Sequence, residues 1–320
     1  MLIRDKNILV TGGAGFIGSH LCESLIKRRP GKLVVVDNLF LGKEENLNDA
    51  RKAFPNLKFY RESIMNISKI KKIISENKID VIFNLAVIPL PASLQKPGLN
   101  FRVNANGTLN LCELCRKGFF KTLIHCSTSE VYGTAQYLPM DEKHPFIPST
   151  PYAASKVAAD QLCLSYAKVF GIDLSIVRPF NNYGPRQNDQ SYAGIIPIVI
   201  NNVLQRKNVE IFGDGKQTRD FIFVKDTAEA MVRICEEEKT RNEVINIAGG
   251  EEISVNQLVR MILTTMKAKD IRVVFKKPRP GDVRRHCAGV KKAKQLIGFQ
   301  SKVSFEKGLK ATINWYQNKG

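Results

Sequence analysis

The sequence has 320 residues, enough for one large domain with a smaller lobe, and its hydrophobic and charged fractions of 43% and 25% are ordinary for a soluble globular protein. No apolar run approaches the length of a membrane span, and the first strand pattern begins too early to leave room for a signal peptide, so we expect a cytoplasmic protein without a membrane partner. The net charge of +19 comes in short pairs without long basic blocks or interleaved aromatics, which argues against nucleic acid as a partner and leaves much of the charge unexplained.

Strand and helix patterns alternate through the first 180 residues. The strands are continuous apolar runs, which indicates a parallel sheet covered by helices on both faces. This is the doubly wound α/β arrangement, in which ligands bind at the carboxyl ends of the strands. Strands are predicted at 7–11, 33–37, 81–86, 122–127 and 174–179, and helices at 16–27, 67–76, 107–116 and 152–169.

Beyond residue 181 the pattern becomes mixed, and glycine, proline, asparagine and glutamine concentrate before residue 194. Runs at 221–224 and 244–248 look like strands that return to the main sheet, and the chain after Gly249 favours helices with one strand at 271–275. We predict two interleaved parts. A dinucleotide-binding domain takes 1–180 and about 221–248, and a smaller α+β substrate lobe takes 181–220 and 249–320.

A lone CxxC pair, Cys112 and Cys115, lies within the predicted helix at 107–116. A spacing of three residues places both thiols on one helix face, and no second pair completes a zinc set. We therefore expect buried, reduced thiols and no metal site.

The loop after the first strand, Thr11–Gly18 (TGGAGFIG), opens the first predicted helix. Gly12 permits the tight turn, Gly15 lets backbone N–H groups approach a diphosphate, and Gly18 lets the helix pack close to the strand. The helix N-terminus offers unpaired donors and a partial positive charge to phosphates. Asp37 ends the second strand, where a carboxylate accepts hydrogen bonds from ribose hydroxyls and repels a 2′-phosphate. The loop therefore predicts a bound dinucleotide, and Asp37 favours NAD over NADP.

Tyr152 and Lys156 stand four residues apart at the start of a predicted helix, so both side chains lie on one face. A lysine ammonium beside a phenol lowers its pKa from about 10 toward neutrality, which would make Tyr152 a general base for a sugar hydroxyl. Such pairs occur on any amphipathic helix. Thr128 and Glu130 add to the pattern, because they follow the strand at 122–127 and so lie at the carboxyl edge of the sheet.

Six motifs occur in order along the chain: 11–18 (TGGAGFIG), 84–86 (NLA), 127–133 (STSEVYG), 152–156 (YAASK), 178–186 (RPFNNYGPR) and 212–226 (FGDGKQTRDFIFVKD). Together they resemble the extended short-chain dehydrogenase/reductase family and, more narrowly, its nucleotide-sugar epimerases and dehydratases. The resemblance covers nearly the whole chain. It implies a Rossmann domain, NAD as cofactor, a nucleoside-diphosphate sugar as substrate, and a homodimer formed through the helices at 107–116 and 152–169.

The resemblance also implies the chemistry. Tyr152, helped by Thr128 and Lys156, would take the proton from the C4 hydroxyl of a hexose while hydride passes from C4 to NAD. Ser129 and Glu130 indicate the branch that follows, because 4-epimerases usually carry small residues there and 4,6-dehydratases carry an acidic or hydroxyl residue followed by glutamate. Glu130 would remove the C5 proton and Ser129 would relay a proton to the hydroxyl that leaves C6. The alternative for Glu130 is a structural carboxylate that caps a helix or pairs with a surface lysine.

Further residues fall where the family has its cofactor and substrate contacts. Asn181 matches an asparagine that contacts the diphosphate, Arg219 and Arg284 match phosphate-binding arginines, and Ser93 matches a serine that contacts the sugar. Arg285 is the substitute for Arg284. The implied cofactor contacts are Gly12, Gly15, Phe16, Ile17, Gly18, Asp37, Asn38, Ser63, Ile64, Leu85, Ala86, Asn104, Tyr152, Lys156 and Pro179.

Three positions depart from the family pattern. Ser63 stands where an aspartate usually holds the adenine, and Val87 replaces an alanine. Ser129 differs from the aspartate of thymidine-sugar dehydratases, but it matches the GDP-mannose type and the UDP-glucuronate decarboxylases.

We predict an NAD-dependent nucleotide-sugar 4,6-dehydratase. A UDP-glucose 4-epimerase type of enzyme and a UDP-glucuronate decarboxylase share the first step and stay open as alternatives, as do the base and the sugar. A non-catalytic dinucleotide- or RNA-binding scaffold is a remote alternative suggested by the charge, and the intact set of Thr128, Tyr152 and Lys156 argues against it.

Overall fold

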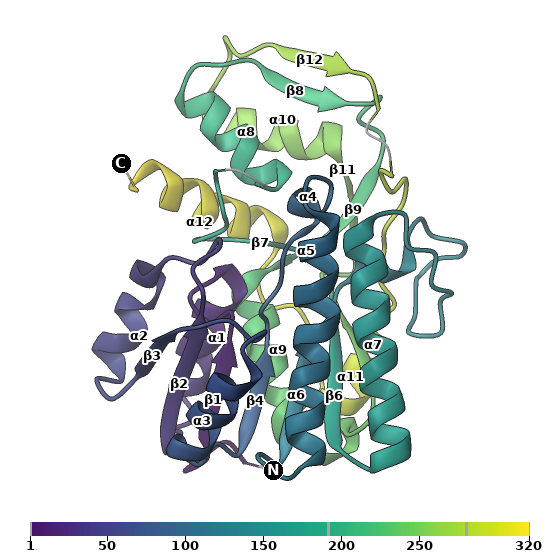
Figure 1. Cartoon of the computed structure of the whole chain (residues 1–320). Coiled ribbons are helices and arrows are strands. Elements are labelled where there is room, and N and C mark those ends of the chain that lie inside the picture. Colours follow the sequence, from purple (N-terminus) through teal and green to yellow (C-terminus); the bar gives the residue numbers. More distant parts are fainter. Residues whose placement is uncertain (1, 191–192, 279–280, 320) are drawn as a thin grey trace.

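The computed structural model describes residues 2–190, 193–278 and 281–319. Its centre is a parallel sheet of seven described strands in the order β10-β6-β5-β4-β1-β2-β3 (Figure 1). The order reverses beside β1, so the doubly wound prediction is confirmed. The strands are β1 (Asn7–Thr11), β2 (Lys32–Asp37), β3 (Lys58–Arg61), β4 (Val81–Asn84), β5 (Thr122–Cys126), β6 (Asp173–Pro179) and β10 (Val244–Ile247).

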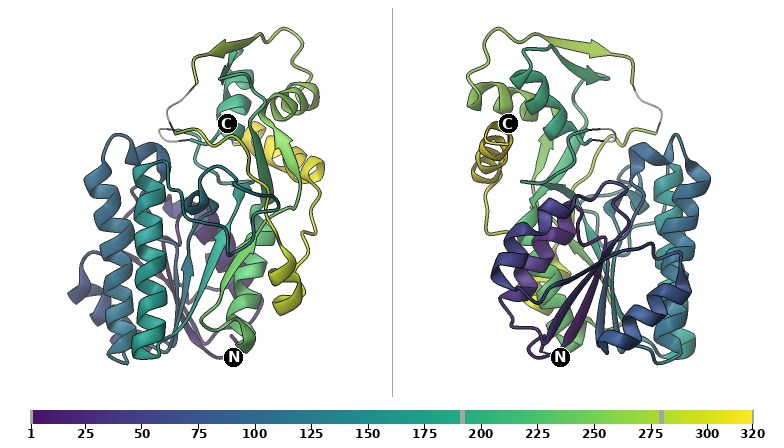
Figure 2. Two further views of the ribbon diagram at one scale, coloured as in Figure 1. Left: turned by 90° about the vertical axis from the view of Figure 1, so that its right-hand side faces the viewer. Right: turned by 60° about the vertical axis from the view of Figure 1, so that its left-hand side comes forward.

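Helices cover both faces of this sheet, with one set on either side in Figure 2. Successive strand residues point to opposite faces: Ile8 and Val10 lie in one apolar cluster, and Leu9 lies in the other. Both faces need apolar side chains, which explains the continuous hydrophobic runs. The first face carries α1 (Phe16–Ile26), α9 (Val224–Glu236) and α11 (Lys291–Ile297), and the second carries α3 (Ile67–Asn77), α6 (Gly107–Arg116) and α7 (Pro151–Phe170).

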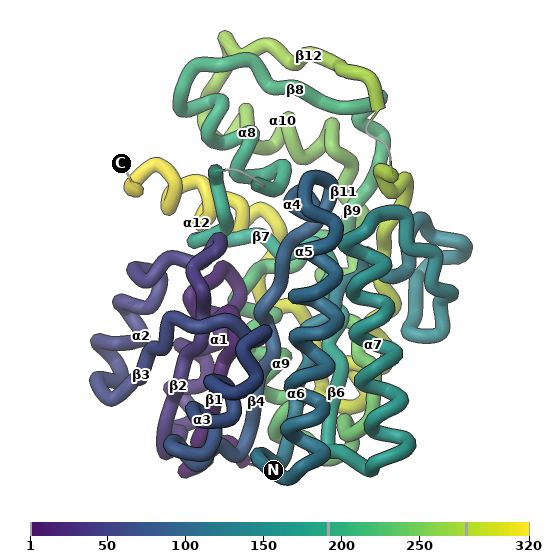
Figure 3. Tube along the Cα trace, in the orientation of Figure 1, coloured from purple at the N-terminus to yellow at the C-terminus, as the bar shows by residue number. Residues whose placement is uncertain are grey.

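Short helical segments shape the edge of the sheet where the strands end. The segments α4, α5 and η2 run into α6 and extend it toward the lobe, as the Cα trace shows (Figure 3). The segments are η1 (Glu44–Leu47), α2 (Asn48–Ala53), α4 (Leu90–Ser93), α5 (Pro97–Phe101), η2 (Arg102–Asn106) and η3 (Ser129–Tyr132), whereas η4 (Glu238–Thr240) lies at the opposite edge, before β10.

The smaller lobe lies above this edge and has its own apolar core around Tyr183, Phe221 and Phe223. It contains two small sheets, β11-β9-β7 and β12-β8. The lobe elements are β7 (Asn181–Tyr183), α8 (Ile195–Leu204), β8 (Val209–Phe212), β9 (Thr218–Phe223), β11 (Glu252–Ser254), α10 (Val255–Thr265), β12 (Val273–Lys276) and α12 (Phe305–Gln317).

Three sequence expectations need correction here. The run at 244–248 joins the main sheet as β10, but the run at 221–224 does not, because β9 pairs with β7 and β11 in the lobe. The sequence predicted only one strand after Gly249, at 271–275, but the structure also contains β11 in that part of the chain. Residues 293–299 were assigned to the lobe, yet Ala293, Ile297 and Phe299 pack in the main apolar cluster with β10 and α9. Among the described residues, no helix is both long and apolar enough to cross a membrane.

Candidate active site

A cavity of about 350 Å³ opens where the strands of the main sheet end. The loops after β1 and β4 leave the sheet in opposite directions, because the strand order reverses between them, and this creates a crevice. Gly12, Asp37, Leu85, Thr128 and Pro179 line the cavity, each from a position at or just after the end of a different strand.

The glycine loop forms the cavity floor with backbone alone. Gly12 has φ +66°, and a Cβ there would lie 2.7 Å from the carbonyl carbon of Leu85. A Cβ on Gly18 would overlap the carbonyl oxygen of Gly12, so this glycine allows α1 to start close to the strand. In the described chain no side chain caps the N-terminus of α1 at Gly15, which leaves the first N–H groups of the helix without side-chain partners.

Asp37 is held as an acceptor at the end of β2. Its carboxylate accepts hydrogen bonds from Ala14 N at 3.0 Å and Leu39 N at 2.8 Å, and the side chain is buried. Burial raises the pKa of Asp37, and the two backbone N–H bonds oppose this shift. The position agrees with a contact to ribose hydroxyls.

Most of the expected cofactor residues line this one cavity. Asn104 does not: its amide donates to Ser155 Oγ at 2.9 Å and accepts from Ile88 N at 2.9 Å, so it braces the loop after β4 against α7. The expected residues that do line the cavity are Gly12, Gly15, Phe16, Ile17, Gly18, Asp37, Asn38, Ser63, Ile64, Leu85, Ala86, Tyr152, Lys156 and Pro179.

Thr128 and Tyr152 meet at the opposite wall of the cavity and share a hydrogen bond. The expected lowering of the tyrosine pKa is not produced by the protein alone. Burial raises the pKa of Tyr152 above its usual value, because a buried phenolate loses its hydration, and the Thr128 hydroxyl offsets only part of this. Lys156 does not reverse the shift, since burial also lowers the pKa of its own ammonium.

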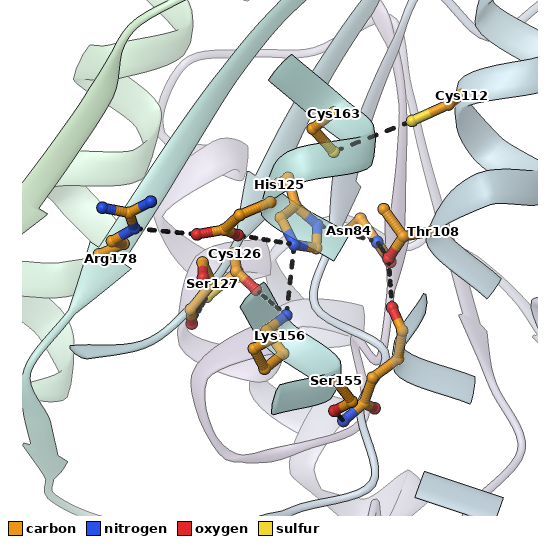
Figure 4. Close-up of polar contacts among 12 residues, drawn as sticks. Asn84, Thr108, Cys112, His125, Cys126, Ser127, Ser155, Lys156, Cys163 and Arg178 are labelled. Atoms are coloured by element: carbon orange, nitrogen blue, oxygen red, sulfur yellow. Dashed lines mark hydrogen bonds and ion pairs between the residues drawn. The ribbon is translucent and has the colours of Figure 1, made fainter. Parts of the chain in front are cut away.

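The ammonium of Lys156 on α7 is held against strand β5, as Figure 4 shows. Its Nζ donates to the Cys126 carbonyl at 2.7 Å and lies 3.3 Å from His125 Nε2. The Asn84 amide nitrogen lies 3.2 Å from His125 Nδ1. Asp160 lies 3.7 Å from His125 Nε2 and pairs with Arg178 at 2.9 Å. Burial and these cations lower the pKa of His125 well below its usual value, so the imidazole stays neutral.

Ser129 and Glu130 form the start of the short helix η3, directly after Thr128. The Thr128 hydroxyl accepts from Glu130 N at 3.2 Å, which fixes the turn. Ser129 is buried and Glu130 is half-buried. Burial raises the pKa of the Glu130 carboxyl, while the charge of Arg219 works against that rise. A raised pKa suits a group that takes up and gives back a proton.

The expected substrate residues already have protein partners. Arg219 donates to the Val283 carbonyl and forms an ion pair with Asp282 at 2.6 Å, and Arg284 forms an ion pair with Asp214 at 2.7 Å. These contacts join β9 to the segment after β12. Arg285, the expected substitute, pairs with Glu252. Asn181 donates to the Asp220 carbonyl at 3.2 Å, and Ser93 donates to the Leu90 carbonyl at 2.7 Å without lining the cavity.

Sequence reasoning missed three cavity residues that have unpaired buried atoms. Ser127 Oγ, Arg186 Nη1 and Gln187 Oε1 are buried and lack a hydrogen-bond partner within the described parts of the chain. All three lie inside motifs quoted above or directly beside them, but a motif does not reveal which atoms remain unpaired after folding.

The seven cysteines carry free thiols, and six of them are buried. Cys112 and Cys115 lie on one face of α6 as expected, and Cys112 Sγ is 3.8 Å from Cys163 Sγ on α7. Within the described residues, no group of three histidine, cysteine, aspartate or glutamate side chains could hold a metal ion.

Comparisons with known proteins find one family model and many similar chains. The model described as GDP-mannose 4,6 dehydratase matches residues 9–312. A putative UDP-glucose 4-epimerase from Methanocaldococcus jannaschii is 36% identical, covering 97% of this chain and 98% of the relative. The crystal structure of a UDP-glucose 4-epimerase from Thermotoga maritima with UDP-glucose has a TM-score of 0.91 at 36% identity, covering 98% of this chain and 99% of that one. A dTDP-glucose 4,6-dehydratase from Streptomyces venezuelae with NAD bound has a TM-score of 0.92 at 28% identity, covering 98% and 97%.

Proposed function

The chain belongs to the GDP-mannose 4,6 dehydratase family of NAD-dependent nucleotide-sugar epimerases and dehydratases, and from this premise we propose that it is a nucleotide-sugar 4,6-dehydratase. The observation that carries the proposal is the turn from Thr128 to Glu130. Thr128 shares a hydrogen bond with Tyr152. Two residues further along, Glu130 brings a carboxyl group with a raised pKa to the same edge of the sheet.

The cavity suits NAD on grounds of its own geometry. The glycine floor leaves no room for side chains beside the N-terminus of α1, and Asp37 presents an anchored carboxylate at the end of β2. When bound, NAD supplies the acceptor for the C4 hydride and gives the hydride back, and the positive charge of its nicotinamide favours a phenolate nearby. Gly12, Gly15, Gly18 and Asp37 would hold it.

The protein side chains move the protons. Tyr152 takes the proton from the C4 hydroxyl, with Thr128 bonded to the same phenol oxygen, which leaves a 4-keto sugar. The ketone acidifies the C5 hydrogen, and Glu130 removes that proton. Ser129 relays that proton from Glu130 to the C6 hydroxyl, which leaves as water. A hydride then reaches C6, a solvent proton taken up through Glu130 adds to C5, and the proton held by Tyr152 passes to solvent, so the sugar has lost one water in total.

A 4-epimerase is the second candidate, and a specific observation favours it. The relatives at 36% identity include a putative UDP-glucose 4-epimerase and a UDP-N-acetyl-alpha-D-glucosaminuronate decarboxylase, while the dTDP-glucose 4,6-dehydratases reach 32%. An epimerase needs Tyr152, Thr128 and Lys156 for the same first step but has no use for a base at C5. Glu130 therefore separates the two candidates.

Turnover in deuterated water distinguishes the candidates. Dehydration exposes the C5 position to solvent protons, so a dehydratase product contains deuterium at C5 and has lost one water. An epimerase product retains all its carbon-bound hydrogens and its mass. Product without deuterium at C5 would contradict the dehydratase proposal and leave the epimerase.

Our further proposals concern the substrate, the residues that bind it, and the assembly of the protein. We propose a nucleoside-diphosphate sugar as substrate, with Asn181, Arg219 and Arg284 near the diphosphate and Ser93 near the sugar. Both arginines would have to share their present carboxylate partners, Asp282 and Asp214, with the incoming phosphates. We also propose a cytoplasmic homodimer that uses the exposed face of α6 and α7.

A further inference from the structure

The segment after β7 crosses from the lobe to the helix that carries the glycine loop. His20 on α1 donates from Nε2 to the Pro185 carbonyl at 3.0 Å. The next residue, Arg186, forms ion pairs through Nη2 with Glu23 on α1 at 2.5 Å and with Asp49 on α2 at 2.9 Å. The lobe is thus tied at this point to the cofactor side of the main domain.

Arg186 adopts a conformation that its surroundings must enforce. Its φ of +66° lies in the left-handed region, which is unfavourable for a residue other than glycine. The side chain is only 11% exposed although it carries a charge. Burial opposes ionisation of Glu23, yet the nearby His20 imidazole and the charge of Arg186 hold the pKa of Glu23 at about 2. Strained backbone of this kind concentrates at functional sites.

Among the described residues, two atoms of this segment are buried without a hydrogen-bond partner. Arg186 Nη1 is a charged donor, and Gln187 Oε1 is an acceptor whose orientation is set by the bond from Nε2 to the Asn182 carbonyl at 3.2 Å. Leaving a buried polar atom unpaired is unfavourable, and more so for a charged group. Such atoms in a native protein point to a ligand or water that completes them.

The dinucleotide cavity is where a ligand would meet both atoms. Arg186 and Gln187 line it together with Gly15, Phe16 and Ile17. They also line a neighbouring cavity of about 560 Å³ between α1, α2 and α12. Acidic and basic side chains both line this second cavity, so it offers little net attraction for an anion. The first cavity has a helix N-terminus that attracts phosphate.

We propose that Arg186 and Gln187 form a second wall of the dinucleotide site. Arg186 Nη1 donates to the cofactor diphosphate, which the glycine loop holds from the other side, and Gln187 Oε1 accepts from a hydroxyl of the cofactor. The bonds to Glu23, Asp49 and His20 keep this wall in place, so the cofactor stays bound through turnover. The proposal rests on NAD binding by the family and not on the choice between dehydratase and epimerase.

The test compares Arg186→Met with Arg28→Met. Arg28 likewise joins two carboxylates, Glu229 and Glu236, but it lines neither cavity. For each purified protein, the NAD retained after gel filtration, the rate of NAD release, and the competition of ADP and of adenosine for the site are measured. ADP carries the diphosphate and adenosine lacks it.

We expect Arg186→Met to release NAD faster and to bind ADP about tenfold to a hundredfold more weakly, with adenosine unchanged, because a charge-assisted hydrogen bond is lost. Arg28→Met should match the parent protein in all three measurements. Arg186→Lys keeps the charge and a partner for Glu23, so it should fold and show an intermediate loss of ADP affinity. Gln187→Leu should release NAD severalfold faster.

An equal loss of ADP and adenosine affinity in the Arg186 variants would mean that the arginine only braces the lobe, which overturns the proposal. Unchanged ADP binding and NAD retention in Arg186→Lys and Arg186→Met would also overturn it. Neither result depends on turnover of any sugar nucleotide, so failure here is distinguishable from failure of the proposed reaction.

Discussion

Burial determines the pKa values of Tyr152 and Lys156 more than the spacing of the two residues does. Tyr152 and Lys156 line the same cavity, as their i, i+4 spacing predicted. Burial raises the pKa of the phenol and lowers that of the ammonium. Each shift disfavours the charged form. In the proposed mechanism, the phenolate of Tyr152 would therefore form when NAD is bound, because the positive charge of the nicotinamide would stabilise it.

Replacing Tyr152 by phenylalanine tests its role as the base. Tyr152→Phe should lower kcat by about 10²-fold or more, because the variant lacks the phenol that takes the C4 proton in the proposed mechanism. The measurement is the rate of product formation with the preferred sugar nucleotide. Tyr166→Phe on the same helix removes a phenol that donates to Glu113 away from the cavity, and it should keep the parent rate. Parent-like activity of Tyr152→Phe would refute the assignment.

Glu130→Gln tests the branch after C4 oxidation. The amide has nearly the shape of the carboxyl group but cannot take up the C5 proton, so dehydration should stop while exchange at C4 continues. The measurements are the yield of dehydrated product and the reduction of bound cofactor on addition of substrate. If Glu130→Gln forms dehydrated product at the parent rate, the carboxyl group is structural.

At the scale of elements, ion pairs between distant segments matter more than those along one helix. Glu23 joins α1 to the segment after β7, whereas Glu113 pairs with Arg116 and Lys117 on its own helix. Both carboxyl groups have a pKa lowered to about 2. Exposed pairs within a helix contribute little to stability, because solvent screens them.

Glu23 should therefore make unfolding pH-dependent. Its folded pKa of about 2 lies below the ordinary 4.5, so its contribution is present above pH 4.5 and is lost as the pH falls through 2. Glu23→Gln should lower the free energy of unfolding at pH 7 by roughly 1–2 kcal/mol, with the difference shrinking toward pH 2. Denaturant unfolding at a series of pH values measures this. Glu113→Gln is the control, and a pH-independent loss in Glu23→Gln would contradict the account.

The sequence predicted the elements that depend on residues close together in the chain. The glycine loop, the helix at 67–76 and six of the seven described strands of the main sheet follow from residue types and spacing, and the structure confirms them, whereas β3 was not predicted. The partner of a strand is not local, so the apolar run at 221–224 was assigned to the wrong sheet. The partners of Arg186 lie on α1 and α2, far along the chain, and its left-handed backbone has no local signature.

At the scale of the molecule, the long face of α6 and α7 is the proposed contact between two copies. The two helices pack side by side, and Val169 and Phe170 at the end of α7 remain 69% and 50% exposed. Exposed apolar side chains grouped on one face often mark an interface. We propose that two copies of the chain meet at these helices.

A charge placed on this face should separate the copies. Val169→Glu together with Phe170→Glu should give a monomer in analytical ultracentrifugation, because burying two carboxylates at an interface is unfavourable. Phe275→Glu changes an equally exposed aromatic on β12 at the far end of the lobe and should leave the oligomer unchanged. A parent-like sedimentation coefficient for the double variant would move the interface elsewhere or exclude it.

The most direct test of the central claim is the mass of the product formed from a panel of UDP-, GDP- and dTDP-hexoses by the purified protein with its bound NAD. We predict that one of these substrates loses the mass of one water without any added reductant, and that Tyr152→Phe abolishes this loss. A product of unchanged mass with inverted C4 would contradict the dehydratase and identify an epimerase.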